Sequence, residues 1–307
     1  MKSNVFAKKC HVLITALLFT SGCGAVEEEV SAPPLTLVEQ SELSDNGLSF
    51  NGLSFNGLSF NGLSFNGLSF NGLSTSSFHS WFQQDPAMAN GVMHYLVRCA
   101  VPAGQTRTYT ASTGQQYTWA GGLGLAPGWA AGAAPTPQEQ QVVSACLAAH
   151  ANRLGAEVSI SVLGRNAQDV DIPYTAAELG SHARRESCFF GNVFTGQGLF
   201  VGADRDPLGA SESTSRACGG LLHGGTETAA PCSPMVHVGA CMTYCTLDSS
   251  GTFFTECTYN GTTYRPLTTR LRVADVHQCG DTKCQATERC GTSFRHDNCG
   301  LDCGPCP

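Results

Sequence analysis

The number and spacing of the cysteines constrain this chain more than any other feature. Its 307 residues include sixteen cysteines, and fourteen of them lie in two groups in the C-terminal two thirds of the sequence. Eight fall between Cys99 and Cys257, and six fall between Cys279 and Cys306. Even numbers of closely spaced cysteines indicate a disulfide framework if the compartment oxidises thiols.

The N-terminal segment indicates which compartment that is. Three lysines form a basic start, and the apolar run at 12–19 that follows is shorter than the roughly 20 residues of a membrane span. The small residues Thr20-Ser21-Gly22 then precede Cys23. This pattern resembles the lipobox of bacterial lipoproteins. An ordinary signal peptide that happens to contain a cysteine is the alternative.

The lipobox resemblance implies that residues 1–22 are a signal peptide, that Cys23 is acylated (palmitate-type chains), and that its new amino terminus is acylated too. Because each buried methylene contributes only about 0.8 kcal/mol, one chain binds a membrane marginally, and several chains give a stable anchor. Gly24 follows the cysteine, where an Asp would favour the inner membrane. We therefore expect an exported protein anchored in the outer membrane, on its periplasmic face or at the cell surface.

Export also bears on the charge and on the cysteines. After residue 22 the chain has fourteen basic and twenty-four acidic residues, a net charge of −10, which argues against nucleic acid as a partner. Without Cys10 and the lipidated Cys23, fourteen cysteines remain. This number predicts four disulfides among the first eight and three among the last six. The eight alone allow 105 pairings, so connectivity stays open. The candidates are Cys99, Cys146, Cys188, Cys218, Cys232, Cys241, Cys245, Cys257, Cys279, Cys284, Cys290, Cys299, Cys303 and Cys306.

Residues 23–77 are predicted to be a flexible linker. The sequence Asn-Gly-Leu-Ser-Phe repeats without interruption from Asn46 to Phe70, and a partial copy extends the repeat to Ser74. These copies would make only about one and a half turns of a pentapeptide coil, too few to bury a core. A disordered spacer is the preferred interpretation; a partner-binding or self-associating element and an ordered β-structure are the alternatives. As a spacer, it would reach about 40 Å from the membrane.

Two helices are predicted near the start of the globular region, residues 78–275. One begins at Asp85, with Pro86 in its first turn, and carries an apolar stripe that includes Cys99. The other begins at a Thr136–Glu139 capping box and ends near Gly155, with Cys146 on its buried face. Because both cysteines lie on core-facing stripes, we expect them to pair.

Strand patterns surround the two helices. They cover 106–111 and 115–120, then 157–163, and finally 253–259 and 262–264, the last two joined by the turn signal Asn260-Gly261. The predicted fold class is α+β, with two helices packed on antiparallel strands. Residues 180–250 are expected to form irregular loops linked by disulfides, with Phe189, Phe190 and Phe200 in the core.

Residues 276–307 are predicted to be a separate Cys-rich module. The segments Cys279-Gly280-Asp281 and Asp302-Cys303-Gly304-Pro305-Cys306 resemble a C-terminal motif of secreted bacterial proteins, and residues 80–275 are similar to an uncharacterised class of secreted, Cys-rich bacterial lipoproteins. Neither resemblance implies an activity. Disulfides are preferred over calcium held by Asp281, Glu288 and Asp302, and over zinc held by thiolates, because exported thiols oxidise.

The sequence offers no recognisable catalytic motif. It has no Gly-x-Ser-x-Gly elbow and no His-Glu-x-x-His helix. Ser144 and His150 share a helix on which they would not face each other, and His223 and His237 flank Cys232 and Cys241 as weak ligand candidates. We therefore expect a non-catalytic binding or structural role without cofactor or metal, with an unidentified envelope or extracellular protein or glycan as a possible partner. The alternative is a secreted hydrolase of unrecognised type with a loop-built site around His182, Asp204, Asp206 and His223.

Overall fold

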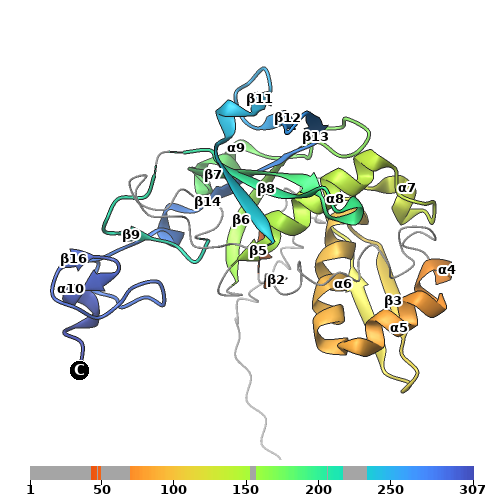
Figure 1. Cartoon of the computed structure of the whole chain (residues 1–307), viewed down its shortest axis with the longest axis horizontal. Helices are drawn as coiled ribbons and strands as arrows, with labels where there is room; N and C mark the ends of the chain where they lie inside the picture. The colour runs from red at the N-terminus through yellow and green to blue at the C-terminus, as the bar shows by residue number, and fades with distance from the viewer. Residues whose placement is uncertain (1–42, 47, 50–69, 153–156, 206, 217–233) are drawn as a thin grey trace, which may run out of the picture. The chain divides into compact units, whose positions relative to one another are not determined.

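The structure is a computed structural model that describes residues 43–46, 48–49, 70–152, 157–205, 207–216 and 234–307 (Figure 1). The predicted signal peptide, Cys23 and repeat residues 50–69 lie outside these ranges. None of the helices in these ranges combines the length and apolar character that a membrane crossing requires.

A six-stranded mixed sheet forms the centre of the fold, in the order β1-β6-β14-β7-β8-β10. All neighbours are antiparallel except β8 and β10, which are parallel. In chain order the strands are β1 (Leu43–Asn46), β6 (Val158–Gly164), β7 (Arg184–Asn192), β8 (Gly198–Ala203), β10 (Met235–Ala240) and β14 (Leu267–Leu271). The α+β class is confirmed.

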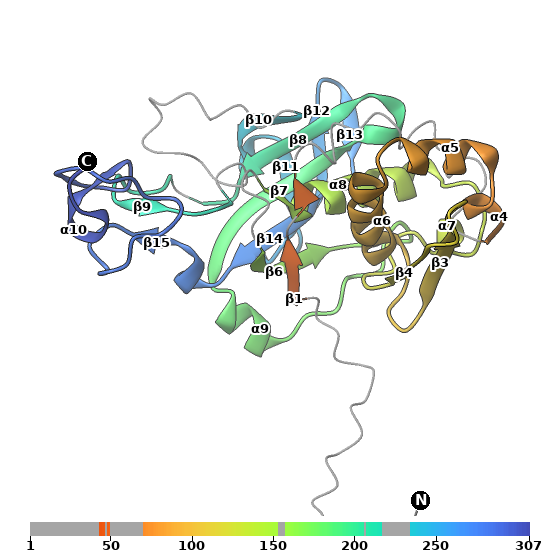
Figure 2. The same cartoon turned by 90° about the horizontal axis from the view of Figure 1, so that it is seen from below.

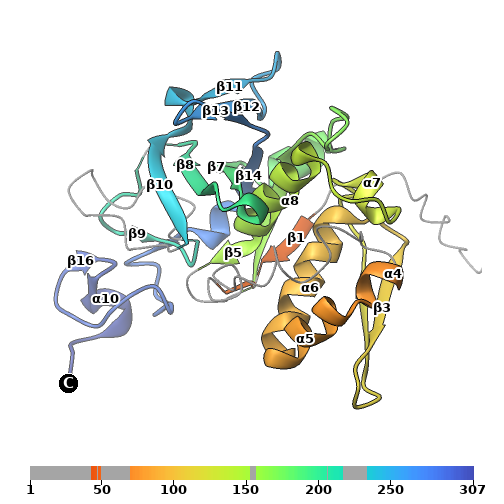
Figure 3. The ribbon, with the colours of Figure 1, turned by 45° about the vertical axis from the view of Figure 1, so that its right-hand side comes forward.

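The two predicted helices are α6 (Pro86–Ala100) and α8 (Pro137–His150). Asp85 caps α6 by accepting the amide of Met88 at 3.0 Å, and Thr136 and Glu139 form the predicted capping box of α8. One side of α8 packs on β7 and β14, and α6 packs against α8 (Figure 3). The predicted starts of both helices are confirmed. They could be predicted from the sequence because side-chain caps depend only on local geometry.

Helix α8 ends earlier than predicted. Its last residue is His150, and Ala151–Asn152 form strand β5, which pairs with β2 (Leu48–Ser49). The side chain of Arg216 donates to the carbonyls of Ala149 and Ala151 at 2.6 and 3.2 Å. A distant arginine therefore satisfies carbonyl groups at the end of the helix, and no local sequence pattern indicates this contact. The predicted helix stop at Gly155 lies outside the described residues.

The expectation of irregular loops over 180–250 is wrong for β7, β8 and β10, which are three neighbouring strands of the central sheet. Phe189 contributes to the core under α8, whereas Phe190 and Phe200 face a second core on the other side. A strand covered on both faces lacks the polar and apolar alternation by which a strand is recognised.

The described domain begins before the predicted boundary at residue 78, and short strands lie within the predicted linker. Helices α4 (Phe70–Leu73) and α5 (Ser76–Gln84) lead into α6, and β1 pairs with β6. Next to α5 and α6 lies a hairpin of the two predicted strands, β3 (Thr106–Thr110) and β4 (Gln116–Ala120) (Figure 2). Aromatic rings fill this region: Phe78, Trp81, Phe82, Tyr109, Tyr117 and Trp119.

A three-stranded sheet covers the face of the central sheet that points away from α8. It contains β11 (Cys245–Leu247), β12 (Phe254–Tyr259) and β13 (Thr262–Tyr264). The predicted hairpin turn is confirmed: Asn260 and Gly261 have φ of 50° and 75°, as a two-residue type I′ turn requires. The smaller elements are α7 (Pro127–Ala130), α9 (Ala176–Ser181), η1 (Val193–Thr195), η4 (Cys241–Thr243) and η5 (Val273–Asp275).

Six disulfides are present in the described ranges: Cys99–Cys146, Cys188–Cys241, Cys245–Cys257, Cys279–Cys299, Cys284–Cys303 and Cys290–Cys306. The predicted Cys99–Cys146 pair is among them. Cys218 and Cys232 lie outside the described residues. The second and third disulfides touch, with the Sγ atoms of Cys188 and Cys245 3.7 Å apart. Gly202 packs so closely there that a Cβ atom would lie 2.9 and 3.0 Å from the Cys188 and Cys241 sulfurs.

The C-terminal region is held mainly by its own disulfides. It includes β16 (Phe294–Arg295), β17 (Asn298–Cys299) and α10 (Gly300–Cys303), and all three of its disulfides join residues within 279–306. The pair β9 (Glu212–Ser213) and β15 (His277–Gln278) ties its start to the rest of the chain. This arrangement fits a small Cys-rich module.

Candidate functional site

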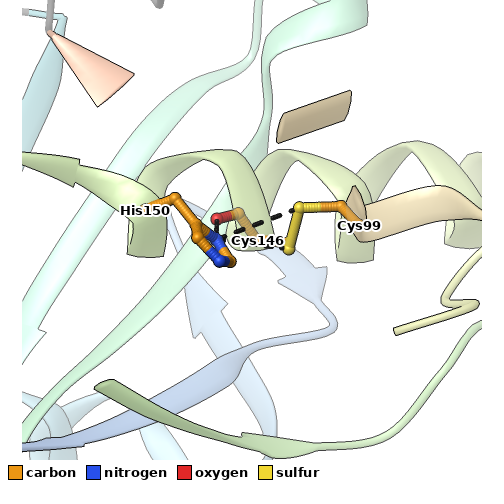
Figure 4. Close-up of side chains that lie close together, drawn as sticks. All are labelled: Cys99, Cys146 and His150. Atoms are coloured by element: carbon orange, nitrogen blue, oxygen red, sulfur yellow. Dashed lines mark hydrogen bonds between the residues drawn. A yellow bond between two sulfur atoms is a disulfide. The ribbon is translucent and has the colours of Figure 1, made fainter. Parts of the chain in front are cut away.

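Cys99, Cys146 and His150 form one of three close clusters of potential metal-ligating groups among the described residues (Figure 4). Helix α6 supplies Cys99, and α8 supplies the other two from successive turns. The imidazole Nδ1 of His150 donates to the carbonyl of Cys146 at 2.8 Å and lies 3.6 and 4.0 Å from the Cys146 and Cys99 sulfurs. All three residues are fully buried.

The residues of this cluster stabilise the core. Burial lowers the pKa of His150 to about 3 and outweighs the hydrogen bond that the ring donates to the Cys146 carbonyl, which raises the pKa. The ring is therefore neutral at ordinary pH, and the two sulfurs are joined to each other. His150 is thus a satisfied core histidine, and Ser144, which accepts the amide of Val193 at 3.0 Å, does not act with it.

A second cluster joins His182 to two serines. Its Nε2 lies 3.2 Å from the Ser159 hydroxyl on β6, and its Nδ1 lies 3.0 Å from the hydroxyl of Ser181. Burial lowers the pKa of His182, against the charge of Glu178, which raises it. This geometry could pass a proton from Ser159 to the ring. A hydroxyl, however, occupies the position from which a carboxylate orients the base in a catalytic triad.

The other residues proposed for a hydrolase site do not gather around His182 in the described ranges. Asp204 instead accepts two hydrogen bonds from Arg185, at 2.8 and 2.9 Å, and burial raises its pKa against the effect of that arginine. Asp206 and His223 lie outside the described residues. Of the alternative hydrolase site, the described residues therefore provide only the Ser159–His182 contact.

His237 lies on strand β10, where its Nδ1 accepts the amide of Gly239 at 3.2 Å. Burial lowers its pKa, and its buried Nε2 has no hydrogen-bond partner in the described part of the chain. Cys241, four residues on, is bonded to Cys188 and is unavailable as a metal ligand. The structure does not assemble a metal site from these two residues.

The acidic residues of the C-terminal module bind backbone amides. Asp302 accepts those of Gly280 and Thr282, Asp281 accepts that of Lys283, and Glu288 accepts that of Gln285. Within the described ranges, the three groups of residues close enough to hold a metal all include cysteines that are already joined in disulfides. The carboxylates of the module thus shape its loops.

Two groups of charged residues, neither of which was predicted from the sequence, have members on strands of the central sheet. Glu186 and Arg216 form a buried ion pair, with Nε to Oε1 at 2.9 Å and side chains 0% and 1% exposed. On the other face, Arg270 of β14 lies directly opposite Arg185 of β7. The available signal was the presence of charged residues inside strand-forming segments, such as Arg270 in Leu-Thr-Thr-Arg-Leu.

Comparison with known proteins adds no assignment to these sites. No family model, no curated protein and no solved structure matches the chain. Any function must therefore be argued from the residues themselves.

Proposed function

We propose that this chain is an exported lipoprotein, acylated on Cys23 and anchored in the outer membrane, whose disulfide-bonded domain has a non-catalytic binding or structural role. The anchor would hold the domain on the periplasmic face or at the cell surface. An envelope or extracellular protein or glycan is the kind of partner that such a position favours.

The observation that carries this proposal is the disulfide framework. Twelve of the fourteen cysteines expected to pair do so within the described residues, in six bonds. Such a framework persists in oxidising compartments and is rare in reducing ones, which supports export. The lipobox-like residues before Cys23 add the anchor.

The chemistry of the described residues favours a non-catalytic role. Among the described residues, His150 lies beside a disulfide, the Nδ1 of His182 contacts a serine hydroxyl and not a carboxylate, and His237 accepts a backbone amide. Activated-serine chemistry usually combines a nucleophile, a base and a group that orients the base.

The anchor is tested by labelling expressing bacteria with an alkyne analogue of palmitate. We expect the wild-type chain and Cys10→Ser to be labelled and Cys23→Ser to be unlabelled, because Cys10 lies in the leader that is removed. Fractionation should place the labelled chain in the outer membrane. Label retained on Cys23→Ser would refute the lipoprotein assignment.

A secreted hydrolase is the second candidate, and the Ser159–His182 contact at 3.2 Å favours it. A fluorophosphonate probe should label Ser159 if His182 activates it. Labelling of the wild type that disappears in Ser159→Ala and His182→Gln would support the hydrolase and overturn the non-catalytic role. Ser144→Ala is the matched control, since Ser144 is committed to the amide of Val193.

A further inference from the structure

A row of polar and charged side chains crosses the face of the central sheet that points away from α8. Arg270 on β14 lies in register with Ser161 of β6 on one side and with Arg185 of β7 on the other. Residues directly opposite on neighbouring strands project from the same face of a sheet, with Cβ atoms about 5 Å apart. Two guanidinium side chains therefore lie next to each other in the middle of the sheet.

A single carboxylate serves this pair, and Arg185 occupies it. The Nε and Nη2 atoms of Arg185 donate to the two oxygens of Asp204 at 2.9 and 2.8 Å, and its Nη1 donates to the carbonyl of Gly251 at 3.3 Å. Arg270 makes no hydrogen bond or ion pair with any residue in the described ranges, and its buried Nε is without a partner. Asp204 also attracts Arg270 at longer range, but among the described residues one carboxylate faces two guanidinium groups, which leaves a net positive charge.

Such an arrangement is unfavourable for the folded protein by itself. Like charges opposite each other destabilise a sheet, and a partly buried charge without a partner carries a desolvation cost. Burial and the neighbouring charge of Arg185 accordingly lower the pKa of Arg270. The Ser161 hydroxyl in the same row is also buried without a hydrogen-bond partner among the described residues. Violations of local stability rules of this kind are expected at functional sites.

The two arginines lie beside a turn that is fixed by hydrogen bonds, and both side chains are partly exposed. The turn before β12 is held by Asp248, which accepts the amides of Ser250 and Phe253 at 3.0 Å each. The Phe253 ring in turn packs edge-on against Tyr174 with centroids 6.5 Å apart. The Arg185 side chain remains 34% exposed and Arg270 is half-buried, so a ligand can approach from solvent.

We propose that Arg270, together with Arg185, binds a carboxylate or another oxyanion group of an external ligand on this face of the sheet. The planar guanidinium group matches the two oxygens of such an anion, and a charge-assisted pair would supply the partner that Arg270 does not find among the described residues. This inference rests on the proposed binding role and names the chemistry of the ligand. The arginine pair acts as a recognition site for one negative group and leaves the rest of the ligand unspecified.

The test uses the soluble chain from residue 24 onward, produced with its disulfides, and follows the arginine Nε–H signals by NMR. Sodium phosphate, acetate and glucuronate are titrated separately at constant ionic strength against sodium chloride, which separates phosphate from carboxylate sources. We expect at least one oxyanion to shift the Arg270 signal in a saturable way, and chloride to leave it unchanged. Equal responses to all four salts would overturn the proposal.

Variants assign the effect to Arg270. Arg270→Gln should weaken binding at least tenfold, and Arg270→Lys, which keeps the charge but loses the fork of donors, should weaken it by less. Arg272→Gln is the matched control, because Arg272 lies two residues away outside the strand and pairs with Asp275 at 2.7 Å. Unchanged affinity in a folded Arg270→Lys and Arg270→Gln would refute the site. Retained palmitate labelling of Cys23 alongside that result would leave the anchor proposal standing.

Discussion

The buried ion pair between Glu186 and Arg216 makes a quantitative prediction about stability. Arg216 donates to both Glu186 oxygens at 2.9 Å and to the carbonyls of Ala149 and Ala151. In Arg216→Met, the carboxylate stays in the interior with only the Thr269 hydroxyl, at 2.7 Å, as a donor among these contacts. Breaking a buried pair from one side costs about 3–5 kcal/mol, a large part of the whole stability of a domain.

The assay is urea unfolding with the disulfides intact, compared between the wild type and each variant. We expect Arg216→Met and Glu186→Gln each to lower the free energy of unfolding by about 3–5 kcal/mol. The double variant should be less destabilised than the sum of the two by about 0.5–3 kcal/mol, because no unpaired charge remains. Asp171→Asn, which removes an exposed partner of Arg165, should cost no more than about 1 kcal/mol. A loss below about 1 kcal/mol in Arg216→Met would refute the reasoning.

Three further predictions concern the disulfides and their neighbours. The pKa of His150 is about 3 in the folded chain against 6.5 in its ordinary state, so the unfolded chain binds more protons between these values. Stability should therefore fall as pH is lowered from about 6.5 towards 3, and His150→Gln should show a shallower fall in melting temperature, whereas an identical slope would contradict the assignment. Replacing Cys99 and Cys146 together by Ala removes a link across 47 residues and should cost about 4 kcal/mol in urea unfolding, with an unchanged value arguing against the bond. Gly202→Ala should lower the free energy of unfolding by about 1–3 kcal/mol, because the new Cβ atom would lie 2.9 and 3.0 Å from two disulfide sulfurs. Gly180→Ala is the control and should be neutral or stabilising, because no atom lies within 4 Å of its Cβ position. Equal melting temperatures for the two variants would contradict the prediction and show that the core around Gly202 can shift to make room.

The features predicted correctly from the sequence are those set by neighbouring residues. Asp85 and Thr136 cap their helices, and Asn260-Gly261 turns the last hairpin, because each depends on a few adjacent backbone groups. The Cys99–Cys146 bond followed from two helical stripes that face one core. Interactions between residues close in the sequence can be predicted without knowledge of the rest of the fold.

The features that were missed depend on contacts between distant segments. Strand β7 was hidden because both of its faces are buried, and the end of α8 depends on Arg216, which lies 67 residues beyond Ala149. The arginine pair could not be foreseen either, since Arg185 and Arg270 become neighbours only through the register of β7 and β14. A sequence shows that such residues are charged, but only the fold shows which of them lack a partner.

The contact between two disulfides in the second core has a consequence for how the chain acquires its bonds. Cys245 and Cys257 are 12 residues apart and can close early, whereas Cys188 and Cys241, 53 residues apart, meet only once β7 and β8 have assembled. Because the Cys188 and Cys245 sulfurs lie 3.7 Å apart, a premature bond between them can be corrected when the Cys241 thiolate attacks Cys188, which forms the native Cys188–Cys241 bond and releases the Cys245 thiolate for a later oxidation with Cys257. Assembly of the sheet thus favours the native disulfides. Because their sulfurs are then buried, external thiols cannot readily reduce or exchange these bonds.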